Sequence, residues 1–125
     1  MHDMQENLQG GYRVAKIAFW ITAGPGLEEK VLANLVLAGR LKANRNQDIE
    51  VYFFGPGVKL AGQAEGFMAE TLQSLSSGEV PMGACPYNAE QYGVGASVTG
   101  QGIKMEPAGE ALVRLTEEGY QIVGV

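Results

Sequence analysis

The sequence predicts an α/β protein with three layers, α/β/α, in which helices cover both faces of a parallel five-stranded sheet. Three observations support this prediction. Strand-like and helix-like segments alternate from about residue 13 to the last residue, in the order βαβαβαβαβ. The first strand-like segment, Lys16–Thr22, is almost continuously apolar, which is typical of a strand buried on both faces. Glycine and proline then mark the ends of the strands.

The first two strand–helix units have clear boundaries. Residues 24–26 read Gly-Pro-Gly and end the first strand, and a helix is predicted over residues 27–43. That helix begins with two glutamates and ends with basic residues, in agreement with the helix dipole. A second strand is predicted over residues 49–54, and residues 55–57 again read Gly-Pro-Gly, which we interpret as a tight turn.

The remaining elements follow from the same signals. Gly66 weakens the prediction of the next helix, because glycine costs about 1 kcal/mol relative to alanine in a helix. Pro81 has no N–H for a strand ladder, so it must lie at a strand start or an edge. The predicted elements are a helix over 63–75, a strand over 80–84, a short helix from 86, a mobile loop over 94–102, a strand over 103–106, a helix over 107–118 and a strand over 120–125.

Composition restricts the classes of protein to which the chain can belong. Its 125 residues suit one domain, which we predict over residues 13–125, after a flexible N-terminal lead-in over residues 1–12. The net charge of −5 and the scattered basic residues argue against a nucleic-acid partner. No apolar stretch approaches the ~18 residues of a membrane span. With 18% charged residues the surface is lightly charged, which suggests that part of it is buried in an oligomer.

The single cysteine, Cys85, lies where a predicted strand turns into a predicted helix. Pro86 suits the first position of that helix, and Gly93 suits the residue after its end, so Cys85 becomes the N-cap. A thiol there faces free backbone N–H groups and the positive end of the helix dipole, which favours the thiolate. The dipole is typically worth ~0.3–1 kcal/mol, so its own helix activates Cys85 only moderately.

The surroundings of Cys85 in the sequence restrict its chemistry. No Lys, Arg or His lies within ten residues of it, and the only histidine, His2, is in the predicted lead-in. Cys85 therefore lacks the partners that a metal site, a Cys-His catalytic pair or a dithiol redox pair would need. We predict no metal and no cofactor. A lone thiolate can still attack a sulfur donor and hold the transferred sulfur as a persulfide. The alternative is that Cys85 is a small buried hydrophobic residue.

Four further residues are candidates for substrate binding. Tyr87 and Asn88 flank Cys85 in its helix, so each is placed to line a site there. Gly24 and Gly26 precede a helix N-terminus, where backbone N–H groups can bind an anion, although this segment matches no phosphate-binding motif. A tight turn is the simpler interpretation of these glycines. Trp20 and Tyr52 fall in predicted strands, so we expect them in the core or at an interface.

The chain resembles the DsrE/DsrF-like family over about residues 13–125. The resemblance rests on the order βαβαβαβαβ, on Cys85 at a strand-to-helix junction with Gly93-Val94 after it, and on the ending. That ending is a short strand, Pro107-Ala108-Gly109, a helix, Glu118-Gly119-Tyr120 and a final strand. The resemblance implies a small cytoplasmic DsrE-like protein that assembles as a homotrimer or homohexamer.

The resemblance also implies a function. Several members of the family carry sulfur as a persulfide on the cysteine that Cys85 matches, in sulfur oxidation or in tRNA thiolation relays. The expected function is therefore that of a sulfurtransferase subunit, which receives sulfur from a donor protein and passes it to a partner thiol. Two alternatives remain open: a non-catalytic oligomeric binding or structural subunit with a packed Cys85, and a binder of small anionic ligands at Gly24-Pro25-Gly26.

Overall fold

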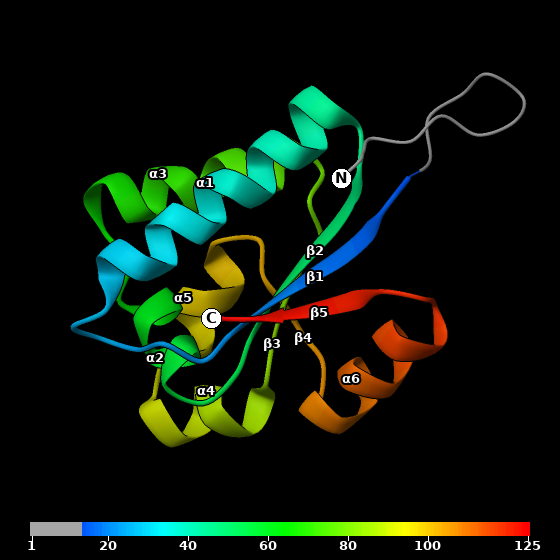
Figure 1. Cartoon of the computed structure of the whole chain (residues 1–125). Coiled ribbons are helices and arrows are strands. Elements are labelled where there is room, and N and C mark those ends of the chain that lie inside the picture. The colour runs from blue at the N-terminus through cyan, green and yellow to red at the C-terminus, as the bar shows by residue number, and fades with distance from the viewer. Residues whose placement is uncertain (1–13) are drawn as a thin grey trace, which may run out of the picture.

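The computed structural model describes residues 14–125, so the predicted lead-in over residues 1–12 lies outside the described residues. Five parallel strands form one sheet in the order β4-β3-β2-β1-β5, as the α/β prediction required (Figure 1). The strands are β1 (Lys16–Ile21), β2 (Asp48–Phe53), β3 (Met82–Ala84), β4 (Lys104–Met105) and β5 (Gln121–Gly124).

The helices form a layer on each side of the sheet. Two long helices, α1 and α3, lie side by side on one face, and α6 lies on the other (Figure 1). The short helices α2, α4 and α5 contact one another at the carboxyl ends of the strands, while α6 lies nearer the amino ends. The helices are α1 (Glu28–Arg45), α2 (Pro56–Gly62), α3 (Gly66–Ser77), α4 (Pro86–Tyr92), α5 (Gly95–Gly100) and α6 (Ala108–Glu117).

The core lies mainly between the sheet and the pair α1 and α3. Alternate strand residues point to this face, because side chains on a strand alternate between its two faces. Their partners are the buried stripes of α1 and α3, which follow the helical repeat. The fully buried residues here include Ile21, Val31, Leu35, Ile49, Val51, Phe53 and Leu72.

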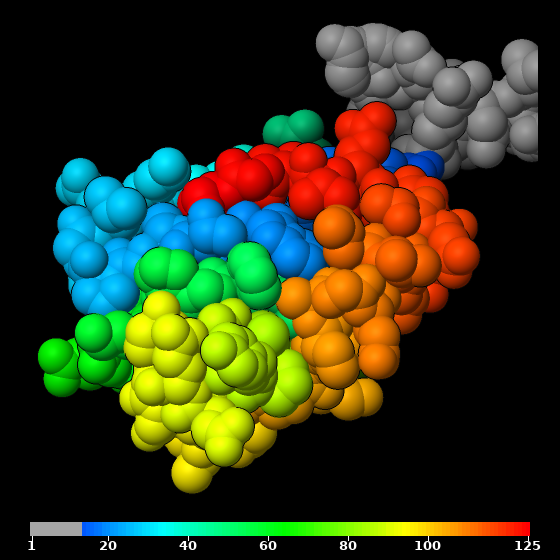
Figure 2. Space-filling view, turned by 90° about the horizontal axis from the view of Figure 1, so that it is seen from below, coloured from blue at the N-terminus to red at the C-terminus, as the bar shows by residue number. Residues whose placement is uncertain are grey.

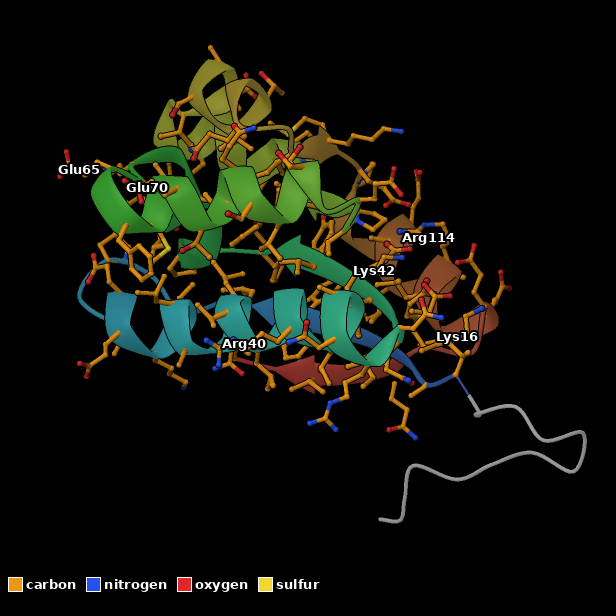
Figure 3. All side chains as sticks on the ribbon, turned by 90° about the horizontal axis from the view of Figure 1, so that it is seen from above. Lys16, Arg40, Lys42, Glu65, Glu70 and Arg114 are labelled. Atoms are coloured by element: carbon orange, nitrogen blue, oxygen red, sulfur yellow. The ribbon has the colours of Figure 1, made fainter. Side chains whose placement is uncertain are left out.

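On the outer side of the same two helices, a mainly apolar groove of about 340 Å³ runs between α1 and α3. Arg40 and Lys42 of α1 line it, and Figure 3 shows both on that helix. Glu65 and Glu70 lie near the start of α3, at the other end of the helix pair (Figure 3). No helix among the described residues is long and apolar enough to cross a membrane.

Two helices correct the sequence prediction. The second Gly-Pro-Gly is more than a turn, because Pro56 is the first residue of α2. The predicted helix over 63–75 corresponds to α3, which begins at Gly66. The segment predicted as a mobile loop over 94–102 contains α5. Both α2 and α5 are short and contain glycine, so packing holds them in place. The side chain of Gln101, after α5, donates to the carbonyl of Ala61 in α2, and Val98 is fully buried.

The two Gly-Pro-Gly segments, residues 24–26 and 55–57, pack against each other, and we call them the paired loops. A Cβ atom on Gly24 would lie 2.5 Å from the Cβ of Pro56. A Cβ atom on Gly57 would overlap the backbone carbonyl of Ile21 at the end of β1. Both glycines are therefore needed for this close approach of two backbones, and the paired loops fix how β1 and β2 end relative to each other.

Candidate functional site

Cys85 lies between the last residue of β3 and the first residue of α4, at the carboxyl edge of the sheet. Ligand sites in open parallel sheets lie at this edge. The backbone of Cys85 is held from both sides. Its N–H donates to the carbonyl of Phe53 at 3.2 Å, and its carbonyl accepts the N–H of Ala89 at 3.0 Å, the first bond of α4. The junction of strand and helix is therefore fixed by backbone hydrogen bonds.

The thiol of Cys85 does not cap α4, although the sequence predicted that it faces the free N–H groups of that helix. The backbone has the extended conformation of an N-cap residue, with φ −74° and ψ 120°, but the side chain makes no capping hydrogen bond to α4. Cys85 is only 6% exposed and belongs to the buried core. Contacts from other elements therefore decide the environment of the sulfur more than its own helix does.

Tyr52 of β2 is one neighbour of Cys85 from another element. It pairs with Gly83, two residues before Cys85, so Tyr52 and Cys85 project from the same face of the sheet. Burial raises the pKa of the Tyr52 phenol well above its ordinary value, and the neighbouring Cys85 and Glu106 side chains raise that pKa further. The phenol donates a hydrogen bond of 2.6 Å to the backbone carbonyl of Glu106.

The ring of Tyr52 is fixed by its neighbours. It stacks on Trp20 of β1 with 4.4 Å between ring centroids, and Trp20 also contacts Phe54. On the β3 side, a Cβ on Gly83 would lie 3.0 Å from the ring, so the glycine leaves room for it. In Figure 2, atoms of β1 and of the segment around β2 reach the surface between α4 and α6. This aromatic group therefore adjoins Cys85 on a face that the helices cover incompletely.

The two residues that flank Cys85 in α4 lie in different environments. Tyr87 is 72% exposed on the outer side of the helix. Asn88 is buried, and its Oδ1 accepts the backbone N–H of Gly55 at 2.8 Å, while its Nδ2 donates to Gln91. Asn88 thus joins α4 to the second of the paired loops, where Gly55 has a positive φ of 60°. Its amide groups are engaged by this structural contact.

We expect Asn88→Ala to lower the free energy of unfolding by about 1–3 kcal/mol, because the N–H of Gly55 then loses its partner. Tyr87→Ala, on the exposed side of the same helix, is the control and should change it by no more than about 0.5 kcal/mol. Urea unfolding of both variants measures the difference. Equal stabilities would mean that Asn88 does not hold the loop.

Gly24 and Gly26 lie in a β-turn. The N–H of Leu27 donates to the carbonyl of Gly24 at 3.0 Å, and Gly26 has the positive φ of 100° that favours glycine in a type II turn. The N–H of Gly26 donates to the carboxylate of Glu28. This carboxylate occupies the place that an anionic ligand would need, so the geometry favours the turn over an anion cradle.

A charged cluster lies on the same sheet face as Tyr52, towards the amino ends of the strands. Arg114 of α6 binds the carboxylates of Glu50 and Glu106 at 3.0 Å and that of Glu118 at 3.3 Å. These hydrogen bonds, with Glu106 first, raise the pKa of Arg114. Figure 3 shows Arg114 on the helix below the sheet, at the end where Lys16 lies. The cluster joins α6 to β2.

A pocket of about 370 Å³ lies between this cluster and β3. Tyr52 forms part of its wall, together with Gly83 and Glu106. Sequence reasoning assigned Tyr52 only to the core or an interface. The sequence contained one signal for a role of Tyr52: it is a phenol in a predicted apolar strand, and a buried tyrosine hydroxyl must find a hydrogen-bond partner. Among residues 14–125, no three His, Cys, Asp or Glu side chains come together in a way that could hold a metal ion.

Comparison with known proteins gives a family and a fold. The sequence model of the DsrE/DsrF-like family matches residues 15–124. None of the curated proteins matches the chain. Among solved structures, the conserved protein of unknown function BT1422 from Bacteroides thetaiotaomicron is similar, with a TM-score of 0.74, 19% identity, and coverage of 86% of this chain and 94% of that one.

Two other solved structures share the fold. The YchN protein from E. coli gives a TM-score of 0.68 at 20% identity, with coverage of 90% of this chain and 100% of that one. MTH1491, a protein of unknown function from Methanobacterium thermoautotrophicum, gives a TM-score of 0.73 at 19% identity, with coverage of 89% and 99%. At these identities the likeness concerns the fold.

Proposed function

Because the chain belongs to the DsrE/DsrF-like family, we propose that it is a sulfurtransferase subunit that carries sulfur as a persulfide on Cys85. The observation that carries the proposal is the position of the single cysteine, at the β3–α4 junction on the carboxyl edge of the sheet. We further propose that the chain works in the cytoplasm as a homotrimer or homohexamer, as the family resemblance implies. Its partners are then a donor and an acceptor of sulfur.

The proposed reaction has two displacement steps. The Cys85 thiolate attacks the outer sulfur of a donor persulfide, R–S–SH, and the S–S bond of the donor breaks. The donor leaves as the thiolate R–S⁻ with the bonding electron pair, and Cys85 holds –S–SH. A thiolate of the acceptor then attacks that outer sulfur, takes it as a persulfide, and releases the Cys85 thiolate. Neither step needs an oxidant, a reductant or a second cysteine in this chain.

Intact-mass analysis tests the proposal directly. After incubation with a persulfide donor and removal of the donor, we expect the protein to gain the mass of one sulfur atom, and treatment with dithiothreitol to reverse the gain. Cys85→Ser should gain none, because the serine hydroxyl does not form a persulfide. A wild-type protein that stays at its original mass, with a donor that loads a reference sulfurtransferase, contradicts the proposal.

The burial of Cys85 favours one alternative, a non-catalytic subunit in which the cysteine only packs. The residue is 6% exposed, and cysteine is among the most often buried residue types. Under this alternative, Cys85→Ala assembles normally, and the wild type takes up no sulfur. The mass measurement above therefore separates the two functions.

A further inference from the structure

Tyr52 lies beside Cys85 on the same face of the sheet, because it pairs with Gly83, two residues before the cysteine. Tyr52 is 2% exposed, and its ring is fixed between Trp20 and the space above Gly83. The titratable groups that face its phenol are Cys85, after β3, and Glu106, after β4. On β1 it faces Trp20, which does not titrate. Its hydroxyl donates to the carbonyl of Glu106, which lies level with Cys85 because the N–H of Glu106 donates to the carbonyl of Ala84. The sulfur of Cys85 is the second possible acceptor on this side of the ring.

A phenol has one proton and donates one hydrogen bond at a time. In the structure it donates to the carbonyl of Glu106 at 2.6 Å. A neutral thiol is a weak acceptor, so this arrangement suits the resting protein. A thiolate is a charged acceptor, and hydrogen bonds to charged groups are roughly twice as strong as neutral ones. The preferred acceptor therefore changes when the sulfur becomes negative.

We propose that Tyr52 is a positioning residue for the Cys85 sulfur: its O–H donates to the carbonyl of Glu106 while the thiol is neutral, and turns to the sulfur when Cys85 is a thiolate or an ionised persulfide. The inference deepens the proposed function and rests on it for the persulfide. The high pKa of the phenol keeps it a donor throughout the neutral range.

Tyr52→Phe removes the hydroxyl and keeps the ring. A matched control is Tyr120→Phe, because Tyr120 is also a partly buried phenol on this sheet face and donates to Asp48 at 2.8 Å, near the amino end of β2. The readout is the rate at which iodoacetamide alkylates Cys85 at pH 7 in the folded proteins. Both variants lose one phenol hydrogen bond, but only Tyr52→Phe changes the surroundings of the sulfur.

Loss of one charge-assisted hydrogen bond should reduce the thiolate population about tenfold. The remaining thiolate is more basic and about threefold more nucleophilic, so we expect Tyr52→Phe to be alkylated about threefold more slowly than the wild type. Tyr120→Phe should react at the wild-type rate. A merely structural role for Tyr52 would loosen the site and speed alkylation instead. A rate equal to or above that of the wild type therefore overturns the inference.

A second measurement uses the unmodified ring and does not depend on the folding of Tyr52→Phe. As the pH is raised, but below the pH at which free tyrosine ionises, the near-ultraviolet spectrum of the wild type should show a tyrosine shift that Cys85→Ala lacks. Identical spectra in the two proteins overturn the inference. A protein that takes up no sulfur, yet shows slower alkylation in Tyr52→Phe, contradicts the proposed function and leaves the role of Tyr52 supported.

Discussion

Gly57→Ala is expected to lower the free energy of unfolding by about 3 kcal/mol, the upper end of the usual cost of overpacking. The added methyl group would overlap the backbone carbonyl of Ile21. That carbonyl also accepts the N–H of Phe54 at 2.9 Å, so moving it breaks a hydrogen bond next to β2. A backbone cannot move to another rotamer as a side chain can. Urea unfolding measures the loss, and thermal unfolding should occur about 10 °C lower.

The control for this prediction is Gly109→Ala. Gly109 lies in α6, and a Cβ atom there meets no atom within 4 Å. Since alanine is the better helix former, this variant should be as stable as the wild type or more stable, by up to about 1 kcal/mol. If Gly57→Ala behaves like Gly109→Ala, the two loops are not as tightly packed as the structure indicates.

The second large effect is a loss of stability at alkaline pH. Burial raises the pKa of Tyr52, and burial with the hydrogen bond to Asp48 raises that of Tyr120, both from an ordinary value near 10. A tyrosine whose pKa is raised in the folded state contributes its full stabilisation below pH 10, where its phenol is protonated in both the folded and the unfolded chain. That stability is lost as the pH rises above 10, because only the unfolded chain then releases the proton.

The expected size follows from the linkage of protonation and folding. One such group changes the free energy of unfolding by about 1.4 kcal/mol per pH unit, so Tyr52 alone should account for a loss of about 2–3 kcal/mol between pH 10 and 12. Tyr120 is more exposed, and solvent screening makes its contribution smaller. Urea unfolding of the wild type and of Tyr52→Phe at pH 9, 10, 11 and 12 measures this. Parallel pH profiles of the two proteins would contradict the prediction.

The sequence was sufficient for the sheet and the long helices, because their signals are local. The apolar run of β1 and the periodic stripe of α1 each follow from a few adjacent side chains, and Pro86 and Gly93 mark both ends of α4. The position of Cys85 between a strand and a helix was predictable for the same reason. Gly93 has the left-handed conformation expected of the residue after a helix, with φ 67°.

The sequence was insufficient where distant contacts decide. The sequence of α5, Gly-Ala-Ser-Val-Thr-Gly, reads as a loop, and this segment is helical because α2 packs against it. A Cβ atom on Gly62 would overlap the side chain of Val94, which shows how closely these elements approach. The position of Tyr52 beside Cys85 was missed for a similar reason, since the two residues come from different strands. Local periodicity carries no information about such contacts.

The paired loops have a consequence for sequence variation in this fold. Gly24 touches Pro56, Gly57 touches Ile21, and Gly55 is bound by Asn88 three residues after Cys85. A loop transplanted from a relative into one of these two places would meet an unmatched partner in the other. We therefore expect changes to be accepted only as a set that replaces both loops and the residue at position 88 together. Loop grafting at this edge should be designed in three segments at once.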